Sequence, residues 1–362
     1  MQPYLQEIVV ERPSHFEEEF FGIGDTGLVL EILRKKTYSN LIAAFVREIP
    51  CNARDANREV GKGDQPIHIK LPWAASPTFE VSDEGLGISR SRMYNVFIKV
   101  GRSTKREDGK QTGGFGIGAK TPFAYTNAFT VDTTALEPDG LLWRCVYSMY
   151  IDETRQGKLA LISREPAKVN KTGTTVIVPI LAEDFDVVRT TVKRHLKYWS
   201  VPPMITDEKE TFSLAQLVES SKTESEFSGK IARFYRDKEA GVLVDEMYYP
   251  VNLSLSSFNE ATASRYGITE TQFLTVKALL NEPLLLAYNN DEMPVAANRE
   301  QLEYTKTTEK QLIEDYLTFA GNYFAQLDTE YVKRNTSLRA SVEFLSATKD
   351  SSYSLYKAYT KQ

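Results

Sequence analysis

The stretch that decides the fold reads Glu48-Ile-Pro-Cys-Asn52-Ala-Arg-Asp55-Ala56. Glu48, Asn52 and Asp55 stand at i, i+4 and i+7, positions that share one face of an α-helix with about 3.6 residues per turn. Two carboxylates and one amide oxygen would therefore point to the same side. A hard cation such as Mg²⁺ prefers oxygen ligands, and a carboxylate can position water. The same residues are also common on a solvated helix face, so the neighbouring motifs must decide between the two interpretations.

Apolar residues before this face predict the helix that carries it. They recur at a spacing of three to four residues and consist of Leu41, Ile42, Phe45 and Ile49. Ser39 is the expected N-cap. Pro50 falls inside the helix, where it removes one backbone hydrogen bond and should produce a kink. We nevertheless expect the helix to continue, because the acidic and amide residues resume in phase after Pro50.

A second motif, Asp83-Glu-Gly85-Leu-Gly87, follows a predicted strand at 78–82 and precedes a predicted helix at 89–98. An Asp at a strand end can accept a hydrogen bond from an exocyclic amine such as that of adenine. Glycines at 85 and 87 let the backbone approach a flat ring closely. A plain Asp-Gly turn would show the same residues, so this motif alone does not decide between the two.

The third motif is Gly113-Gly114-Phe-Gly116-Ile117-Gly118-Ala-Lys120. Backbone N–H groups unobstructed by side chains, at the start of a helix, bind phosphate well. The motif lacks the adjacent Gly-Lys of a Walker A loop, and no βαβ unit carries it as a dinucleotide fingerprint would require. Residues 99–112 are polar, charged and glycine-spaced, which predicts a mobile loop. Lys105 and Lys120 are candidate phosphate contacts.

The overall composition is that of an ordinary globular protein. The chain has 362 residues and a net charge of −5, and its only cysteines are Cys51 and Cys145. This length favours two domains. The acidic balance argues against a protein built to grip nucleic-acid phosphates, and two cysteines are too few for a disulfide scaffold. Without an 18-residue apolar run or a signal-peptide pattern, we expect no transmembrane segment and a cytoplasmic location.

The three motifs, in this order and with a loop before the third, resemble the GHKL superfamily of ATPases, which includes gyrase B, MutL, histidine kinases and the Hsp90 chaperones. A fourth element, Gly173-Thr174-Thr-Val, fits the same pattern, and the resemblance covers about residues 25–180. It implies a Bergerat ATP-binding fold, which is an α/β sandwich with a mixed, mostly antiparallel sheet and helices on one face. It also implies ATP and Mg²⁺ as cofactors.

The resemblance assigns roles to individual residues. Glu48 would orient and deprotonate water, Asn52 would ligate Mg²⁺, and Asp83 would read adenine with support from Thr174. Asp55 would orient the helix that carries Glu48. The remaining nucleotide contacts would come from Gly85, Gly87, Lys105, Gly114, Gly116, Ile117 and Gly118.

The second half contains Asn298-Arg299-Glu-Gln-Leu302, which resembles the Hsp90 middle-domain element whose arginine reaches the γ-phosphate. By this resemblance Arg299 is a catalytic sensor, a role suited to its permanent charge and forked donors. The chain also resembles bacteriophage rIIA-like proteins, through residues 38–48, 113–125 and 298–302. Those proteins are usually longer, so functions of their C-terminal half do not transfer.

We therefore expect an ATP-binding domain over residues 1–200, a transducer-like α+β domain over 201–333 and a helical or flexible tail over 334–362. The predicted function is slow, Mg²⁺-dependent ATP hydrolysis with closure of a lid and of the domains. The phage resemblance implies a role in lysis timing or host exclusion, in the host cytoplasm, with a homodimer and a host or phage client as partners. The alternative is a nucleotide-dependent interaction module without meaningful turnover. A histidine kinase is disfavoured, because no helix pair carries a phosphoacceptor histidine.

Overall fold

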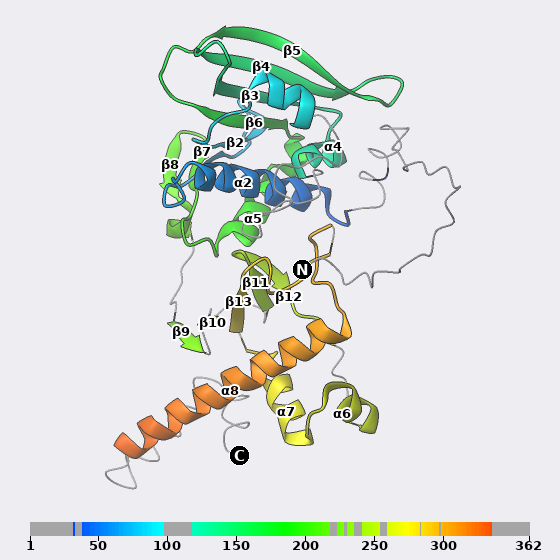
Figure 1. Ribbon diagram of the computed structural model, residues 1–362, viewed down its shortest axis with the longest axis vertical. Helices are drawn as coiled ribbons and strands as arrows, with labels where there is room; N and C mark the ends of the chain where they lie inside the picture. Colours follow the sequence, from blue (N-terminus) through cyan, green and yellow to red (C-terminus); the bar gives the residue numbers. More distant parts are fainter. Residues whose placement is uncertain are drawn as a thin grey trace, which may run out of the picture. The chain divides into compact units, whose positions relative to one another are not determined.

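The computed structural model describes residue 32 and residues 38–97, 118–217, 223–227, 230–234, 241–253, 259–282, 284–296 and 298–334. The chain divides into two compact units between Val218 and Glu219. Figure 1 shows both units, and each is described by itself below. In the part of the chain described, no helix combines the length and the apolar character needed to span a bilayer.

The first unit is built on an eight-stranded sheet with the order β5-β4-β3-β6-β2-β1-β7-β8. Strands β1 and β7 are parallel, and the other neighbours are antiparallel. This confirms the predicted α/β class with a mixed sheet. The strands are β1 (His68–Lys70), β2 (Thr78–Ser82), β3 (Ala128–Leu136), β4 (Leu142–Ile151), β5 (Gly157–Pro166), β6 (Gly173–Pro179), β7 (Met204–Asp207) and β8 (Glu210–Ser213).

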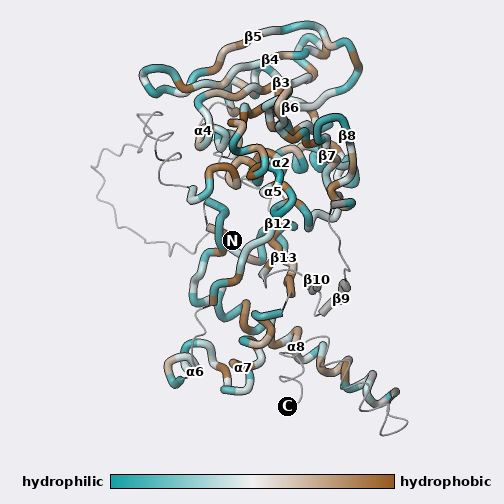
Figure 2. Tube along the Cα trace, turned by 180° about the vertical axis from the view of Figure 1, so that it is seen from behind, coloured by the Kyte–Doolittle hydropathy of each residue, from teal (hydrophilic) through white to brown (hydrophobic). Residues whose placement is uncertain are grey.

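Alternation along the central strands separates a covered face of the sheet from a polar one. Phe79 and Val81 of β2 are buried, as are Phe129 and Val131 of β3. The residues between them are only partly buried, and Figure 2 shows that β3 carries both hydrophobic and hydrophilic residues. An antiparallel sheet with one face against a core shows this pattern, so the helices are needed on one side only.

Helix α2 (Leu41–Glu59) fills the covered side. Its Phe45 ring lies 5.6 Å from the ring of Phe79 and 5.5 Å from that of Tyr125. The helix continues through Pro50, as predicted from the phase of the polar residues. Its N-cap is Asn40 rather than Ser39, because Asn40 Oδ1 accepts from Ala43 N at 2.9 Å.

Shorter helical segments surround α2. They are α3 (Arg90–Arg92), the π-helical turn η2 (Met93–Phe97), the 3₁₀ turns η3 (Gly118–Lys120), η4 (Ala182–Asp184) and η5 (Leu214–Leu217), and the helices α4 (Pro122–Tyr125) and α5 (Phe185–Leu196). Helices α4 and α5 both contact α2, and Figure 1 shows α2 and α5 on the same side of the sheet.

The boundary between the units differs from the one predicted at residue 200. Strand β7 pairs in parallel with β1, with Ile205 opposite Ile69, and Ile205 is fully buried. The segment Ser200-Val-Pro-Pro203 is therefore a turn inside the first unit rather than a linker. Prolines stop a helix locally, but the next apolar strand can still return to the same sheet.

The second unit has a five-stranded sheet with the order β12-β11-β13-β10-β9. Strands β11 and β13 are parallel, and the other neighbours are antiparallel. The elements are β9 (Thr223–Phe227), β10 (Lys230–Phe234), β11 (Gly241–Val244), β12 (Met247–Pro250), β13 (Leu284–Tyr288), α6 (Glu260–Tyr266), α7 (Glu270–Leu279) and α8 (Lys306–Arg334). The predicted tail beyond residue 334 lies outside the described residues.

Candidate functional site

The end of the glycine-rich motif lies directly against the polar face of α2. A Cβ added to Gly118 would stand 2.3 Å from Glu48 Oε2 and 3.7 Å from Asn52 Nδ2. A separation of 2.3 Å is too short for any side chain, so only glycine fits here without moving Glu48. Glu48 is 6% exposed and Asn52 is partly buried. The structure thus brings together three of the predicted site residues.

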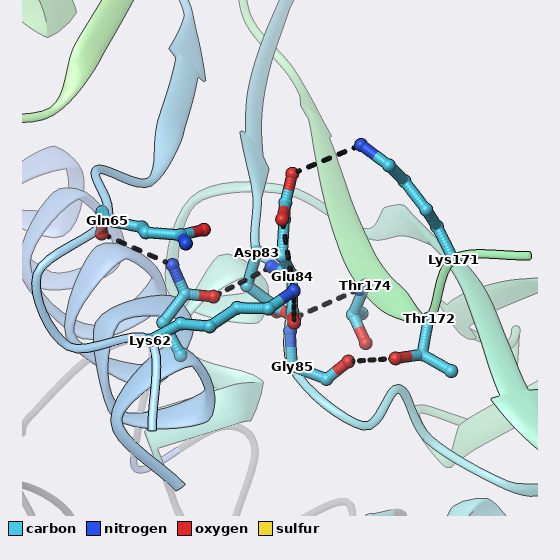
Figure 3. A network of polar contacts seen from close by, with 9 residues as sticks. Lys62, Gln65, Asp83, Glu84, Gly85, Lys171, Thr172 and Thr174 are labelled. Atoms are coloured by element: carbon cyan, nitrogen blue, oxygen red, sulfur yellow. Dashed lines mark hydrogen bonds and ion pairs between the residues drawn. The ribbon is translucent and has the colours of Figure 1, made fainter. Parts of the chain in front are cut away.

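The Asp83 turn forms a second cluster, shown in Figure 3. Asp83 Oδ1 accepts from Gly85 N at 2.9 Å and from Thr174 N at 3.2 Å, while Asp83 N donates to Thr174 O at 2.9 Å. Thr174 Oγ1 lies 3.1 Å from Thr133 Oγ1. Thr174 thus contacts Asp83 through its backbone, while its hydroxyl, which was predicted to support base reading directly or through water, lies against Thr133.

Both glycines of this turn stand against backbone atoms. A Cβ on Gly85 would lie 2.9 Å from Ala56 O, and a Cβ on Gly87 would lie 2.0 Å from Thr134 O. Gly87 also has φ +71°, a left-handed conformation that side chains disfavour. Glycine at 85 allows the turn to sit on α2, and glycine at 87 allows it to sit on β3.

The two clusters meet the same helix at different points. Gly118 contacts the Glu48 side chain and Gly85 contacts Ala56. Eight residues of helix separate these positions, which corresponds to about 12 Å along the axis. The site is therefore elongated, with Glu48 and Asn52 towards one end and Asp83 at the other.

Asp55 lies in the protein interior between these ends. It is 1% exposed, and its Oδ1 stands 3.9 Å from Arg58 Nη1. A carboxylate buried beside an arginine one turn later on the same helix is suited to fixing local structure. The predicted role of Asp55 in nucleotide binding stays a prediction.

Lys120 ends the η3 turn and is 4% exposed. Burial lowers its pKa to about 8, and its Nζ lies 5.5 Å from the centre of the Phe97 ring. A buried ammonium is unfavourable in an apolar environment. An approaching anion would therefore stabilise the charged form of Lys120.

Of the other predicted contacts, four lie outside the described residues and one lies in the second unit. Lys105, Gly114, Gly116 and Ile117 lie outside the described residues. Arg299 belongs to the second unit, at the tip of a hairpin closed by a bridge between Val295 and Leu302. It has φ +54°, and its N donates to Ala296 O at 2.7 Å. Such a conformation is uncommon for a residue other than glycine and often marks a functional turn.

A metal would depend on few protein ligands here. Within the described ranges, no group of three His, Cys, Asp or Glu side chains could hold an ion. Mg²⁺ usually binds through one or two protein oxygens together with substrate phosphates. The Asn52 amide beside Gly118 carries one oxygen of this kind, and the amide atom nearest to the position of an added Gly118 Cβ is Nδ2.

Sequence reasoning missed the residues that brace the Asp83 turn. Asn57 Oδ1 accepts from Glu84 N at 2.7 Å, Thr172 Oγ1 donates to Gly85 O at 2.6 Å, and Ile88 N donates to Thr133 Oγ1 at 2.8 Å. Asn57 carried no signal of this role in the sequence, because nine residues at about 100° each place it on the opposite side of the helix from Glu48. The two threonines follow strand patterns that say nothing about the turn.

His195 of α5 is a buried histidine that should make the stability of the first unit depend on pH. Its Nδ1 is buried without a hydrogen-bond partner. Burial, together with the charges of Arg47, Arg194 and Lys197, lowers its pKa to about 3. The unfolded chain takes up this proton below about pH 6.5, whereas the folded chain resists it. The histidine therefore causes stability to fall as pH drops from about 6.5 towards 3.

We expect the wild-type free energy of unfolding to drop by about 2 kcal/mol more than that of His195→Gln between pH 7 and pH 5. All three tryptophans lie in the first unit, so their fluorescence reports its denaturant unfolding. His68→Gln provides the control, since it replaces a histidine of the same unit whose side chain is exposed rather than packed in the core. Parallel pH profiles for wild type and His195→Gln would contradict the prediction.

No family model matches this sequence, and no curated protein gives a significant match.

Proposed function

We propose that the first unit binds ATP with Mg²⁺ and hydrolyses it slowly, in the manner of a GHKL ATPase. The observation that carries this proposal is the contact of both glycine motifs with one helix, Gly118 at Glu48 and Gly85 at Ala56. The site is elongated. The oriented carboxylate of Asp83 lies at one end, and Glu48 and Asn52 lie beside the Gly118 backbone at the other. This arrangement suits an extended nucleoside triphosphate.

Asp83 would bind the base. Its carboxylate is oriented by two backbone N–H donors, Gly85 N and Thr174 N. A carboxylate fixed in this way accepts a hydrogen bond from an exocyclic amine without losing side-chain entropy. Adenine presents such an amine.

Glu48 would act on water at the other end. Its carboxylate holds a water molecule and takes its proton as the water oxygen bonds to the terminal phosphorus and ADP leaves. Asn52 Oδ1 would be the protein ligand of Mg²⁺, which would supply neutralisation of the charge that develops on the phosphates. Lys120, Lys105 and the backbone of residues 114–118 would stabilise the phosphates, and Arg299 is proposed as the sensor of the γ-phosphate.

Asp83→Asn tests the base-binding end. The substitution keeps one oxygen but removes the charge that strengthens the bond to the amine, so ATP affinity should fall about 10- to 100-fold. Calorimetry with ATP and Mg²⁺ measures the change. Asp132→Asn is the matched control, because Asp132 lies on the polar face of β3, paired with Arg144. Equal affinity in Asp83→Asn would place the base elsewhere.

A nucleotide-dependent interaction module without turnover remains the second candidate. Pro50 favours it, because this residue lies between Glu48 and Asn52 inside α2 and leaves the helix without one backbone hydrogen bond at the catalytic residues. In a single-turnover assay, release of intact ATP supports the module, and release of ADP and phosphate supports the enzyme. A role in phage lysis timing or host exclusion rests on the rIIA-like resemblance alone.

A further inference from the structure

A buried amide connects α2 to the Asp83 turn. Asn57 is 1% exposed, and its Oδ1 accepts from Glu84 N at 2.7 Å. Its Nδ2 donates to Gln65 O at 3.5 Å, close to the limit for a hydrogen bond. A buried amide is unfavourable unless it is hydrogen-bonded. The short bond to Glu84 N is therefore its main interaction with the turn.

This bond fixes the peptide that directly follows Asp83. Glu84 N points to Asn57, whereas the next amide, Gly85 N, points to Asp83 Oδ1 at 2.9 Å. Because a peptide group is planar, holding Glu84 N also sets the direction of the Asp83 carbonyl and the backbone torsion at Asp83. Asn57 of α2 thus holds the backbone next to Asp83, and this backbone sets the direction of the Asp83 carboxylate.

Lys62 and Lys171 also contact Glu84 (Figure 3), and Lys62 Nζ donates to Glu84 O at 3.1 Å. Lys62 Nζ stands 3.1 Å from Glu84 Oε2, and Lys171 Nζ stands 3.7 Å from Glu84 Oε1. The Lys62 hydrogen bond is the main reason that the pKa of Glu84 is lowered. Exposed ion pairs of this kind contribute little to structure, so the buried bond from Asn57 is the stronger constraint.

We propose that Asn57 is a positioning residue for base recognition, which holds the Asp83 turn so that its carboxylate meets the exocyclic amine of the nucleotide. The inference rests on the proposed function, because it concerns the same nucleotide. The inference predicts different effects on the two ends of the site, where the base and the phosphates bind. Removing the Asn57 amide weakens recognition of the base and leaves recognition of the phosphates intact.

The test titrates the full chain, in the presence of Mg²⁺, with ATP and with inorganic tripolyphosphate, which has no base. Asn57→Ala should weaken ATP binding about 10-fold and change tripolyphosphate binding by less than about twofold. Asn40→Ala is the matched control. It removes an amide at the other end of the same helix, where Asn40 caps the first turn. A loss of stability alone should leave the ratio of the two affinities unchanged.

A double-mutant cycle tests whether Asn57 acts through Asp83. In the Asp83→Asn background, Asn57→Ala should cause little further loss of ATP affinity, because the oriented charge is already absent. Fully additive losses would overturn the inference. If Asn57→Ala does not fold, Asn57→Ser keeps a polar group in the same space and should show the same selective loss for ATP.

The outcomes distinguish this inference from the proposed function. If wild type binds neither ATP nor tripolyphosphate, the proposed function fails and the inference fails with it. If wild type binds ATP and Asn57→Ala binds it equally well, the inference alone is wrong. Equal losses for ATP and tripolyphosphate in Asn57→Ala would likewise show a general structural role and overturn it.

Discussion

Glu48→Ala is expected to lower the rate of ATP hydrolysis by about 10²- to 10⁴-fold, the usual contribution of a positioned general base. Nucleotide affinity should change little, because Asp83 and the phosphate-binding backbone are untouched. Steady-state phosphate release measures the rate, and calorimetry measures the affinity. The combination would assign Glu48 to the chemical step rather than to binding.

Glu59→Ala is the control for this variant. Glu59 is the last residue of α2 and is exposed, so the substitution removes a carboxylate from the same helix without touching the site. It should hydrolyse ATP at the wild-type rate. Unchanged hydrolysis in Glu48→Ala would remove Glu48 from its proposed role, and a large loss of affinity would make it a binding residue.

Gly87→Ala should destabilise the first unit by about 2–5 kcal/mol. A side chain in the left-handed region accounts for about 1–2 kcal/mol of this. The rest, about 1–3 kcal/mol, comes from overpacking, since the new Cβ would lie 2.0 Å from Thr134 O, a backbone atom that moves only with β3. Denaturant unfolding followed by tryptophan fluorescence measures the loss.

Gly140→Ala separates these two causes. Gly140 has φ +78°, but no atom lies within 4 Å of the position where its Cβ would stand. This variant should show only the conformational part, about 1–2 kcal/mol. If Gly87→Ala and Gly140→Ala destabilise equally, the turn is not held against β3 as described.

Most features of helix α2 could be predicted from the periodicity of the sequence. The apolar stripe and the phase of Glu48, Asn52 and Asp55 were sufficient to predict a helix continuing through Pro50, because burial of one face outweighs a single lost hydrogen bond. The N-cap was misplaced by one residue, since Ser39 and Asn40 are both good caps and only the geometry selects between them. The strand pattern at 78–82 was likewise local and was predicted correctly.

Long-range pairing was not predictable in the same way. Nothing in Met204–Asp207 indicates that this strand pairs with His68–Lys70, more than 130 positions earlier, so the first unit was predicted too short. The same limit applies to Asn57. Its place on α2 could be read from the sequence, but its contact with Glu84 N depends on where the Asp83 turn packs.

One consequence follows from the placement of both clusters along α2. Because α2 is a rigid helix, it fixes the distance between the Gly118 contact at Glu48 and the Gly85 contact at Ala56. Inserting one residue between Glu48 and Ala56 would lengthen the helix by about 1.5 Å and turn its far end by about 100°. Such a change would move Ala56 away from Gly85 while Glu48 stayed at Gly118. The number of helical residues between Glu48 and Ala56 therefore determines the distance between the two ends of the site.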